Sequence, residues 1–186
     1  PVEGGASNYV VTVGNRGSSR RMPRPRWSAD GSRILYTEDQ GANADEKTVL
    51  LSIRPDGTDK RSHLKVGYAE EIIPSPDGDW VLFSRVHEGY LAALPELGDA
   101  PLEVSGEGGP VPVFRLSRDG ADWLDWSRGG RTITWGFGPR FFRIDLDDVR
   151  REWIAKQTEA GRKTDPAPAD TSGGDGDTFA AEADTT

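Results

Sequence analysis

The chain has no cysteine and only two histidines among its 186 residues. Without cysteine it forms no disulfide and offers no thiolate for catalysis or metal binding. No apolar run reaches the length of about 18 residues that a membrane-spanning helix needs, so the sequence predicts no such helix. It contains neither a glycine-rich phosphate loop nor the Gly-x-Ser-x-Gly turn of serine hydrolases. These absences exclude thiol chemistry and give no support to nucleotide hydrolysis or a serine triad.

The charge balance is acidic, with 31 Asp and Glu against 23 Lys and Arg and a net charge of −8. Five of the acids lie in residues 166–186, which hold no Lys or Arg. Nucleic-acid binding is disfavoured, because phosphate binding requires a basic face. One basic cluster near the N-terminus consists of Arg16, Arg20, Arg21, Arg24 and Arg26. It is either an anion site or a solvated loop, and we favour the loop.

A short unit occurs three times along the chain. It consists of a Ser-x-Asp-Gly type turn followed by an apolar strand, and it occupies residues 26–37, 73–84 and, in a looser form, 125–135. Aligning Gly31, Gly78 and Gly130 gives separations of 47 and 52 residues. Repetition near this period, with several short strands in each unit, is typical of β-propeller blades.

The sequence therefore predicts an all-β fold, a partial β-propeller of about three four-stranded antiparallel blades. Residues 1–21 are expected to end a preceding, truncated blade, with a strand at Tyr9–Val13, and residues 22–146 to form the blades. The expected strands are 24–28, 33–38, 48–53 and 62–66; then 69–74, 80–85, 89–94 and 111–117; then 122–126, 131–136 and 140–146. Residues 95–110, rich in Gly and Pro, are expected to form a loop.

A helix is expected at residues 147–162, after the capping pair Asp147-Asp148. Its apolar face would hold Val149, Trp153 and Ile154, together with Gln157. Residues 163–186 are rich in Pro, Gly, Ala, Asp and Thr, with Phe179 as the one large apolar residue. We interpret them as a disordered acidic linker or tail, because such a segment buries too little surface to offset its ordering entropy.

The strongest candidates for catalytic carboxylates are Asp30 and Asp77, and each directly precedes glycine in the repeated turn. Aspartate in such a turn binds its own backbone, so we assign them a structural rather than a catalytic role. The predicted structural turn residues are Asp30, Gly31, Asp56, Gly57, Asp77, Gly78, Gly129 and Gly130. The sequence gives no catalytic, cofactor-binding or metal-binding residue.

The remaining candidates are also interpreted as structural. His63 lies in an expected strand and His87 in a tight loop, and two isolated imidazoles do not make a metal site. The acidic group Asp145, Asp147 and Asp148 is interpreted as a strand end and helix cap rather than a calcium loop. Asp175 and Asp177, in the tail, are interpreted as solvated charge. Three tryptophans are expected to pack between blades rather than bind a ligand: Trp27, Trp126 and Trp135.

The repeated turn followed by an apolar strand resembles the TolB-type propeller repeat. Residues 51–61 and 63–66, and then 112–117, 120–126, 132–136 and 141–146, resemble segments of the TolB-like propeller of a family of bacterial amidohydrolases. The resemblance covers residues 22–149. Gly129 departs from it, because an aspartate usually stands there, and residues 163–186 lack the His-x-His strand of the catalytic barrel.

The resemblance implies a non-catalytic accessory domain, the N-terminal propeller of a metal-dependent amidohydrolase in the periplasm or secreted. Its expected partners are further blades and a catalytic barrel of the same parent chain, of which this sequence would be a fragment. Zinc is expected only in that barrel, and no cofactor in this chain. Two alternatives stay open: a stand-alone TolB-like protein-interaction propeller, and the propeller of a serine peptidase.

Overall fold

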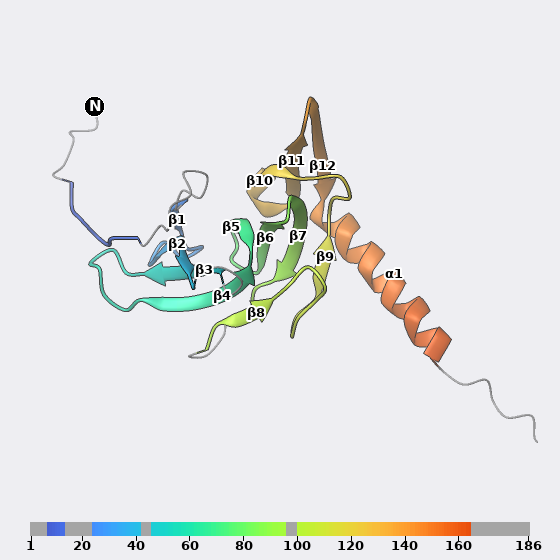
Figure 1. Cartoon of the computed structure of the whole chain (residues 1–186), viewed down its shortest axis with the longest axis horizontal. Helices are drawn as coiled ribbons and strands as arrows, with labels where there is room; N and C mark the ends of the chain where they lie inside the picture. The colour runs from blue at the N-terminus through green and yellow to red at the C-terminus, as the bar shows by residue number, and fades with distance from the viewer. Residues whose placement is uncertain (1–6, 14–23, 42–45, 96–99, 165–186) are drawn as a thin grey trace, which may run out of the picture.

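The computed structural model describes residues 7–13, 24–41, 46–95 and 100–164, with side chains to residue 155. It is mostly β-structure, followed by one C-terminal helix (Figure 1). The described residues form twelve strands: β1 Arg26–Trp27, β2 Ile34–Gln40, β3 Lys47–Ile53, β4 Arg61–Gly67, β5 Ala69–Pro74, β6 Trp80–Arg85, β7 Glu88–Ala93, β8 Leu102–Val104, β9 Val113–Arg115, β10 Asp122–Ser127, β11 Thr132–Phe137 and β12 Arg140–Asp145. Helix α1 spans Leu146–Thr164.

The strands form three separate sheets, and within the described residues none of them closes on itself. The first sheet has the order β1-β2-β3-β4-β8, the second β5-β6-β7-β9 and the third β10-β11-β12. All neighbours are antiparallel except β4 and β8, which are parallel. The sheets follow one another in chain order, from β1–β4 through β5–β7 to β10–β12, where α1 leaves the body (Figure 1).

Each sheet begins with the same hairpin, in which the repeated turn joins the first strand to the second. The pairs β1–β2, β5–β6 and β10–β11 are all antiparallel neighbours, and the last two each contain a register shift in the first strand. The turns therefore lie at one end of each sheet, and the turn between β3 and β4 lies at that end too, because Ile34 pairs with Ile53. We call this end of the molecule the turn end.

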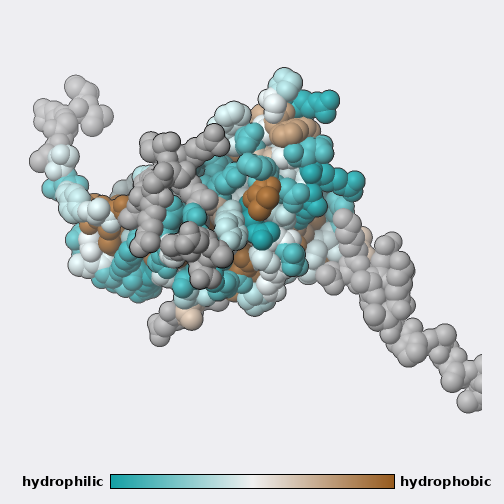
Figure 2. Space-filling view, viewed as in Figure 1, coloured by the Kyte–Doolittle hydropathy of each residue, from teal (hydrophilic) through white to brown (hydrophobic). Residues whose placement is uncertain are grey.

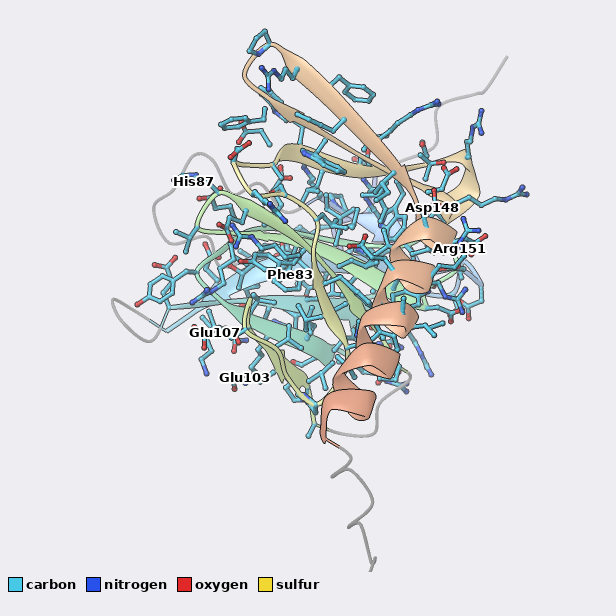
Figure 3. The ribbon with its side chains drawn as sticks, turned by 90° about the vertical axis from the view of Figure 1, so that its right-hand side faces the viewer. Phe83, His87, Glu103, Glu107, Asp148 and Arg151 are labelled. Atoms are coloured by element: carbon cyan, nitrogen blue, oxygen red, sulfur yellow. The ribbon has the colours of Figure 1, made fainter. Side chains whose placement is uncertain are left out.

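Two hydrophobic cores hold the sheets together. Between the first and second sheets lie Leu50, Leu64, Val66, Ile72, Val81 and Phe83, all buried. Figure 3 shows Phe83 in the middle of the stacked strands. The second core joins the second and third sheets and α1 through Ile73, Leu82, Leu91, Leu124, Trp126, Ile133, Trp135 and Val149. The alternation of buried residues along β6 and β7 is weak because these strands are covered on both faces.

The expected loop at residues 95–110 contains a strand, so that prediction is wrong in part. After β7 the chain leaves the second sheet and forms β8, which pairs in parallel with β4 of the first sheet. The chain then returns to the second sheet as β9, which pairs with β7. Leu102 and Val104 are buried in the first core while Glu103 is exposed. This excursion ties the first two sheets together and gives the first sheet five strands.

The predicted strand at Tyr9–Val13 is also wrong. These residues pair with no strand. Instead Val10, Val11 and Val13 pack against Tyr36, Val49, Leu51 and Ile53 on the face of the first sheet that points away from the second. Their apolar character serves to cover this face, which explains the β-branched run without a β-ladder.

Helix α1 begins one residue before the expected start and extends two beyond the expected end. Val149 is buried, and Trp153 packs edge-to-face against Phe114 with ring centroids 5.6 Å apart. Ile154, expected on the same face, is 58% exposed. No helix in the described part of the chain has both the length and the apolarity to span a bilayer. The expected disordered tail lies outside the described residues.

Candidate binding groove

The first repeated turn is a closed hydrogen-bonded unit. The Ser28 amide donates to Arg33 O at 2.9 Å, and the Gly31 amide donates to Ser28 O at 2.9 Å. The Asp30 carboxylate accepts the Ser28 hydroxyl at 2.6 Å and the Ser32 amide at 3.1 Å. These bonds, that of the Ser28 hydroxyl first, lower the pKa of Asp30 to about 2. Asp30 therefore accepts hydrogen bonds within its own turn, as its place before glycine predicts.

The second turn repeats the first position by position. The Ser75 amide donates to Trp80 O at 2.8 Å, and the Gly78 amide to Ser75 O at 3.1 Å. Asp77 accepts the Ser75 hydroxyl and the Asp79 amide. Gly78 has φ +86°, close to the +70° of Gly31, which is the left-handed region that glycine adopts without strain.

The third turn keeps the glycine but not the aspartate. Gly130, aligned with Gly31 and Gly78, has φ +91°, while Gly129 has φ +66° in a short 3-10 turn. A side chain at Gly130 would begin 3.2 Å from the Pro76 ring, so the third turn packs closely on the second. The turn between β3 and β4 uses a related device: Asp56 accepts the Thr58 amide at 2.9 Å, and Gly57 has φ +82°.

The first strands of the three sheets are linked to one another. Arg24, just before β1, forms an ion pair with Glu71 of β5 at 2.8 Å, and Arg26 of β1 pairs with Asp125 of β10 at 2.7 Å. The Trp126 indole donates to Ile73 O of β5 at 3.1 Å. The first strands of all three sheets are therefore joined to one another by these contacts.

A groove of about 1080 Å³ opens at the turn end between the first and second sheets. Its first-sheet wall consists of the turn before β2 and the start of β4, and its second-sheet wall consists of the turn before β6, the end of β7 and Pro101 before β8. It is the size of a pocket that holds a small molecule or a short peptide. Both walls are charged: the first carries Arg33, Lys60, Arg61 and Lys65 together with Asp30 and Asp59, and the second carries Asp77 and Asp79.

A polar network lies beneath the first-sheet wall. The Arg33 guanidinium donates to Ser52 Oγ at 2.7 Å and to Asp59 Oδ2 at 2.8 Å. Arg61 binds the same carboxylate through two nitrogens, at 3.0 and 2.9 Å. Arg54 Nε lies 3.4 Å from it. Asp59 has φ +55°, so its backbone takes the left-handed conformation that places this carboxylate between the three arginines.

The network lowers the pKa of two of its groups. The hydrogen bonds from Arg61 and then Arg33 lower the pKa of Asp59 to about 2. Burial, followed by the charges of Arg33 and Arg61, lowers the pKa of His63 below 6.5. His63 Nε2 lies 2.7 Å from Ser52 Oγ. The direction of this hydrogen bond depends on the imidazole tautomer, because a hydroxyl that accepts from Arg33 keeps one O–H donor and a second lone pair.

The structure does not bring the two histidines together. His63 lies in β4, while His87 lies in the β6–β7 turn, 73% exposed, with Nδ1 3.4 Å from Glu70. In Figure 3 His87 lies at the opposite side of the molecule from Asp148 and Arg151 of α1. The described residues contain no group of three or more His, Asp or Glu side chains placed to hold a metal ion.

The other predicted candidates each have separate partners. Asp145 accepts the Thr132 hydroxyl at 2.8 Å, Asp147 lies 3.8 Å from Arg150, and Asp148 pairs with Arg151. Of the tryptophans, Trp126 and Trp135 are buried between sheets as expected. Trp27 is 61% exposed, so packing between blades is the wrong role for it.

Two of the five arginines in the predicted basic cluster are described, and both form ion pairs with other sheets. Arg24 and Arg26 bind carboxylates of β5 and β10, so they are neither an anion site nor part of a solvated loop. Arg16, Arg20 and Arg21, like the tail acids Asp175 and Asp177, lie outside the described residues.

Sequence reasoning missed the arginine cluster around Asp59. The sequence does show that residues 54–61 hold five charged side chains, namely Arg54, Asp56, Asp59, Lys60 and Arg61. What the sequence does not give is Arg33, which reaches the turn from 26 residues upstream. A comparison with models of known protein families finds no match, and a comparison with curated proteins finds none either. The resemblance to TolB-like propellers therefore stays a prediction.

Proposed function

We propose that this chain is part of a β-propeller and serves as a non-catalytic module, the accessory domain of a metal-dependent amidohydrolase. Further sheets would complete the ring, and a catalytic barrel in the same parent chain would carry out the hydrolysis. The module would position or recruit what the barrel acts on, at its turn end. The periplasm or the extracellular space is the proposed location, by the same resemblance.

The observation that carries the propeller part is the repeated turn. Two turns separated by 47 residues share the same five hydrogen-bonding positions, from Ser28 to Arg33 and from Ser75 to Trp80. Each begins a separate antiparallel sheet, and the first strands of the sheets are joined by ion pairs. This combination supports blades arranged about a common centre, since blades of a propeller meet at their first strands.

The amidohydrolase part rests on the resemblance of residues 51–66 and 112–146. The zinc of such an enzyme needs several His and a carboxylate in one place. In this chain His63 is held by Ser52, and His87 lies in an exposed turn beside Glu70. The two do not suit that site, so the proposal assigns zinc to the barrel alone.

Two measurements test the proposal separately. Sequencing the native gene past Thr186 should reveal a His-x-His strand and further His and Asp at later strand ends. The purified chain should take up no stoichiometric zinc and should hydrolyse no amide, ester or lactone. A stop codon directly after Thr186 would overturn the amidohydrolase assignment. Zinc bound at one equivalent with hydrolytic activity would overturn the non-catalytic one.

A protein-interaction propeller is the second candidate, and the groove between the first two sheets favours it. The groove is wide, open at the turn end and charged on both walls. Such a surface suits a peptide segment of another protein better than a small apolar ligand. A stop codon after Thr186 would leave this candidate as the better account.

A further inference from the structure

The run at residues 9–13 has the composition of a strand but no strand partner. Its five residues, Tyr-Val-Val-Thr-Val, are all of types that are enriched in strands. Within the described part of the chain, their backbone groups join no ladder and form no hydrogen bond with another backbone group. None of the five residues is buried, and Tyr9 is 79% exposed. The segment therefore contacts the first sheet through side chains, and its backbone remains available for pairing.

The third sheet has the complementary property, a long edge strand with one neighbour. Strand β12 pairs with β11 alone among the described residues, and Figure 1 shows these two strands extending away from the body. The other outer strands are shorter: β1 has two residues, β8 and β9 have three each, and β12 has six. Strands β5 and β10 end their sheets on the side where the first strands are joined. Short edge strands limit pairing with another chain, and β12 lacks this protection.

The register of β12 shows which of its backbone groups face outward. The Leu146 amide donates to Arg131 O at 2.8 Å, so these two residues form a hydrogen-bonded pair at the end of the ladder. Opposed residues of an antiparallel ladder alternate between hydrogen-bonded and non-hydrogen-bonded pairs. Counting back along the register, Arg143 and Phe141 both belong to non-hydrogen-bonded pairs. Their amide and carbonyl groups therefore point away from β11, where they can bind an incoming strand.

The two outer faces of the row of sheets are both apolar. That of the third sheet carries Trp123 and Phe141, which are 70% and 73% exposed. That of the first sheet lies beneath residues 10–13 and consists of Tyr36, Val49, Leu51 and Ile53. Within one chain the second sheet separates these two faces. A second copy, by contrast, can bring its third sheet directly onto the first sheet of its partner.

We infer that residues 9–13 of a second copy add as a strand to the outer edge of β12, so that two copies exchange these segments. Each chain carries both the segment and the edge, so the exchange is reciprocal and closes at a dimer. The Trp123–Phe141 face of one copy then covers the first-sheet face that the segment of the other copy leaves. Twelve residues separate Val13 from β1, and a chain of that length reaches about 40 Å. The inference goes beyond the proposed function and does not depend on a catalytic barrel.

Because the chain has no cysteine, a disulfide test of this pairing is specific. One preparation of the full chain carries Arg143→Cys, and two others carry Val11→Cys or Thr12→Cys, which lie on opposite faces of a strand. When these are mixed with a mild oxidant, one of the two should cross-link to Arg143→Cys about fivefold faster than to Glu103→Cys, since a disulfide needs closely opposed residues. Glu103 is the matched control, because its side chain is 60% exposed on β8, the edge strand of the first sheet.

Proline variants test the strand pairing itself. Arg143→Pro removes an amide that faces away from β11, so the ladder within the hairpin is kept, and Arg143→Ala is its control with the amide present. Val10→Pro combined with Val11→Pro removes two adjacent amides, one of which faces β12 in any register, and Val10→Thr with Val11→Thr is its control. Analytical ultracentrifugation should show the dimer weakened about tenfold in both proline variants and changed less than about twofold in both controls.

The outcomes separate this pairing from other kinds of association. Added salt should change the dimer little, because residues 7–13 carry no charge. Equal cross-linking to Arg143→Cys and Glu103→Cys would overturn the inference, and so would proline variants that associate as the wild type does. A chain with both cysteines that cross-links only to itself would show its own segment on β12 instead. If far-UV circular dichroism shows that Arg143→Pro does not fold, the proline pair in the segment decides.

Discussion

At the scale of single residues, His63 shows how a neighbourhood sets a charge. It lies in β4, half-buried, between Ser52 and two arginines. Burial disfavours the imidazolium, and the positive charges of Arg33 and Arg61 disfavour it further. The neutral ring is therefore part of the folded network, and protonating it would place a third positive charge beside Arg33 and Arg61.

The pKa of His63 should be measurably below 6.5 in the folded protein. A His87→Gln variant leaves one imidazole, so its NMR titration is unambiguous. Because the folded pKa lies below the unfolded one, the unfolded chain binds the proton first as the pH falls. The free energy of unfolding should therefore be highest above pH 6.5 from this group and decline below it. His63→Gln should flatten that slope, and an unchanged slope would contradict the assignment.

The free energy of unfolding should decrease again in a separate, more acidic pH range. Asp30 and Asp59 both have pKa values of about 2, lowered from 3.8. Their contribution is present above pH 3.8 and is lost as the pH falls toward 2. Loss of stability below pH 3.8 thus includes the contribution of these turn carboxylates, and at higher pH the difference between the wild type and His63→Gln isolates the contribution of the histidine.

At the scale of an element, the turn between β5 and β6 depends on Asp77. Asp77→Ala removes the acceptor for the Ser75 hydroxyl and the Asp79 amide. It should lower the free energy of unfolding by about 1 kcal/mol, measured by urea denaturation. Asp79→Ala is the matched control, because Asp79 contributes its backbone amide rather than its carboxylate to this turn. Unchanged stability of Asp77→Ala would contradict this role of the carboxylate in the turn.

Elements with a local signature were predictable from the sequence. The strands at 69–74 and 80–85 were predicted at the bounds of β5 and β6, because a short apolar run bounded by turn residues leaves little choice. β8 has no such signature. It is three residues long, lies among glycines and prolines, and exists because Leu102 and Val104 meet β4 from 38 residues away. Such non-local pairing outweighs local preference.

The candidate site divides in the same way. Asp30, Gly31, Asp77 and Gly78 were assigned to turns because aspartate before glycine acts within five residues of chain. The arginine cluster could not be predicted, since it needs Arg33 beside a carboxylate 26 residues later and a left-handed backbone at Asp59. An aspartate in that conformation is uncommon, and no sequence pattern marks it.

At the scale of the whole molecule, the three sheets differ in how their outer surfaces are covered. The outer face of the first sheet is covered by residues 10–13. In the third sheet, Gly136 pairs with Phe141 and the ring of Trp123 lies over Gly136. A Cβ atom at position 136 would lie 3.2 Å from Trp123 Cε3. Trp123 and Phe141 therefore share the face opposite Trp135 and Phe142, and they are 70% and 73% exposed.

This uncovered face stands out from the rest of the surface. On the face shown in Figure 2, hydrophobic patches are small and separated by hydrophilic side chains. The third sheet also has three strands where the second has four, and within the described residues β12 pairs with β11 alone. An apolar face beside an open strand edge promotes association between chains.

The purified chain should therefore self-associate through its third sheet. Size-exclusion chromatography with light scattering should show a mass that rises with concentration, because the open edge and the Trp123–Phe141 face pair with another copy. Phe141→Lys places a charge on that face and should shift the chain toward monomer without lowering its melting temperature. Ile154→Lys, at a 58% exposed apolar residue of α1, is the matched control and should leave the mass unchanged. A wild-type chain that stays monomeric at all concentrations and melts cooperatively above about 65 °C, high for a mesophile domain, would show that the third sheet is not an association surface.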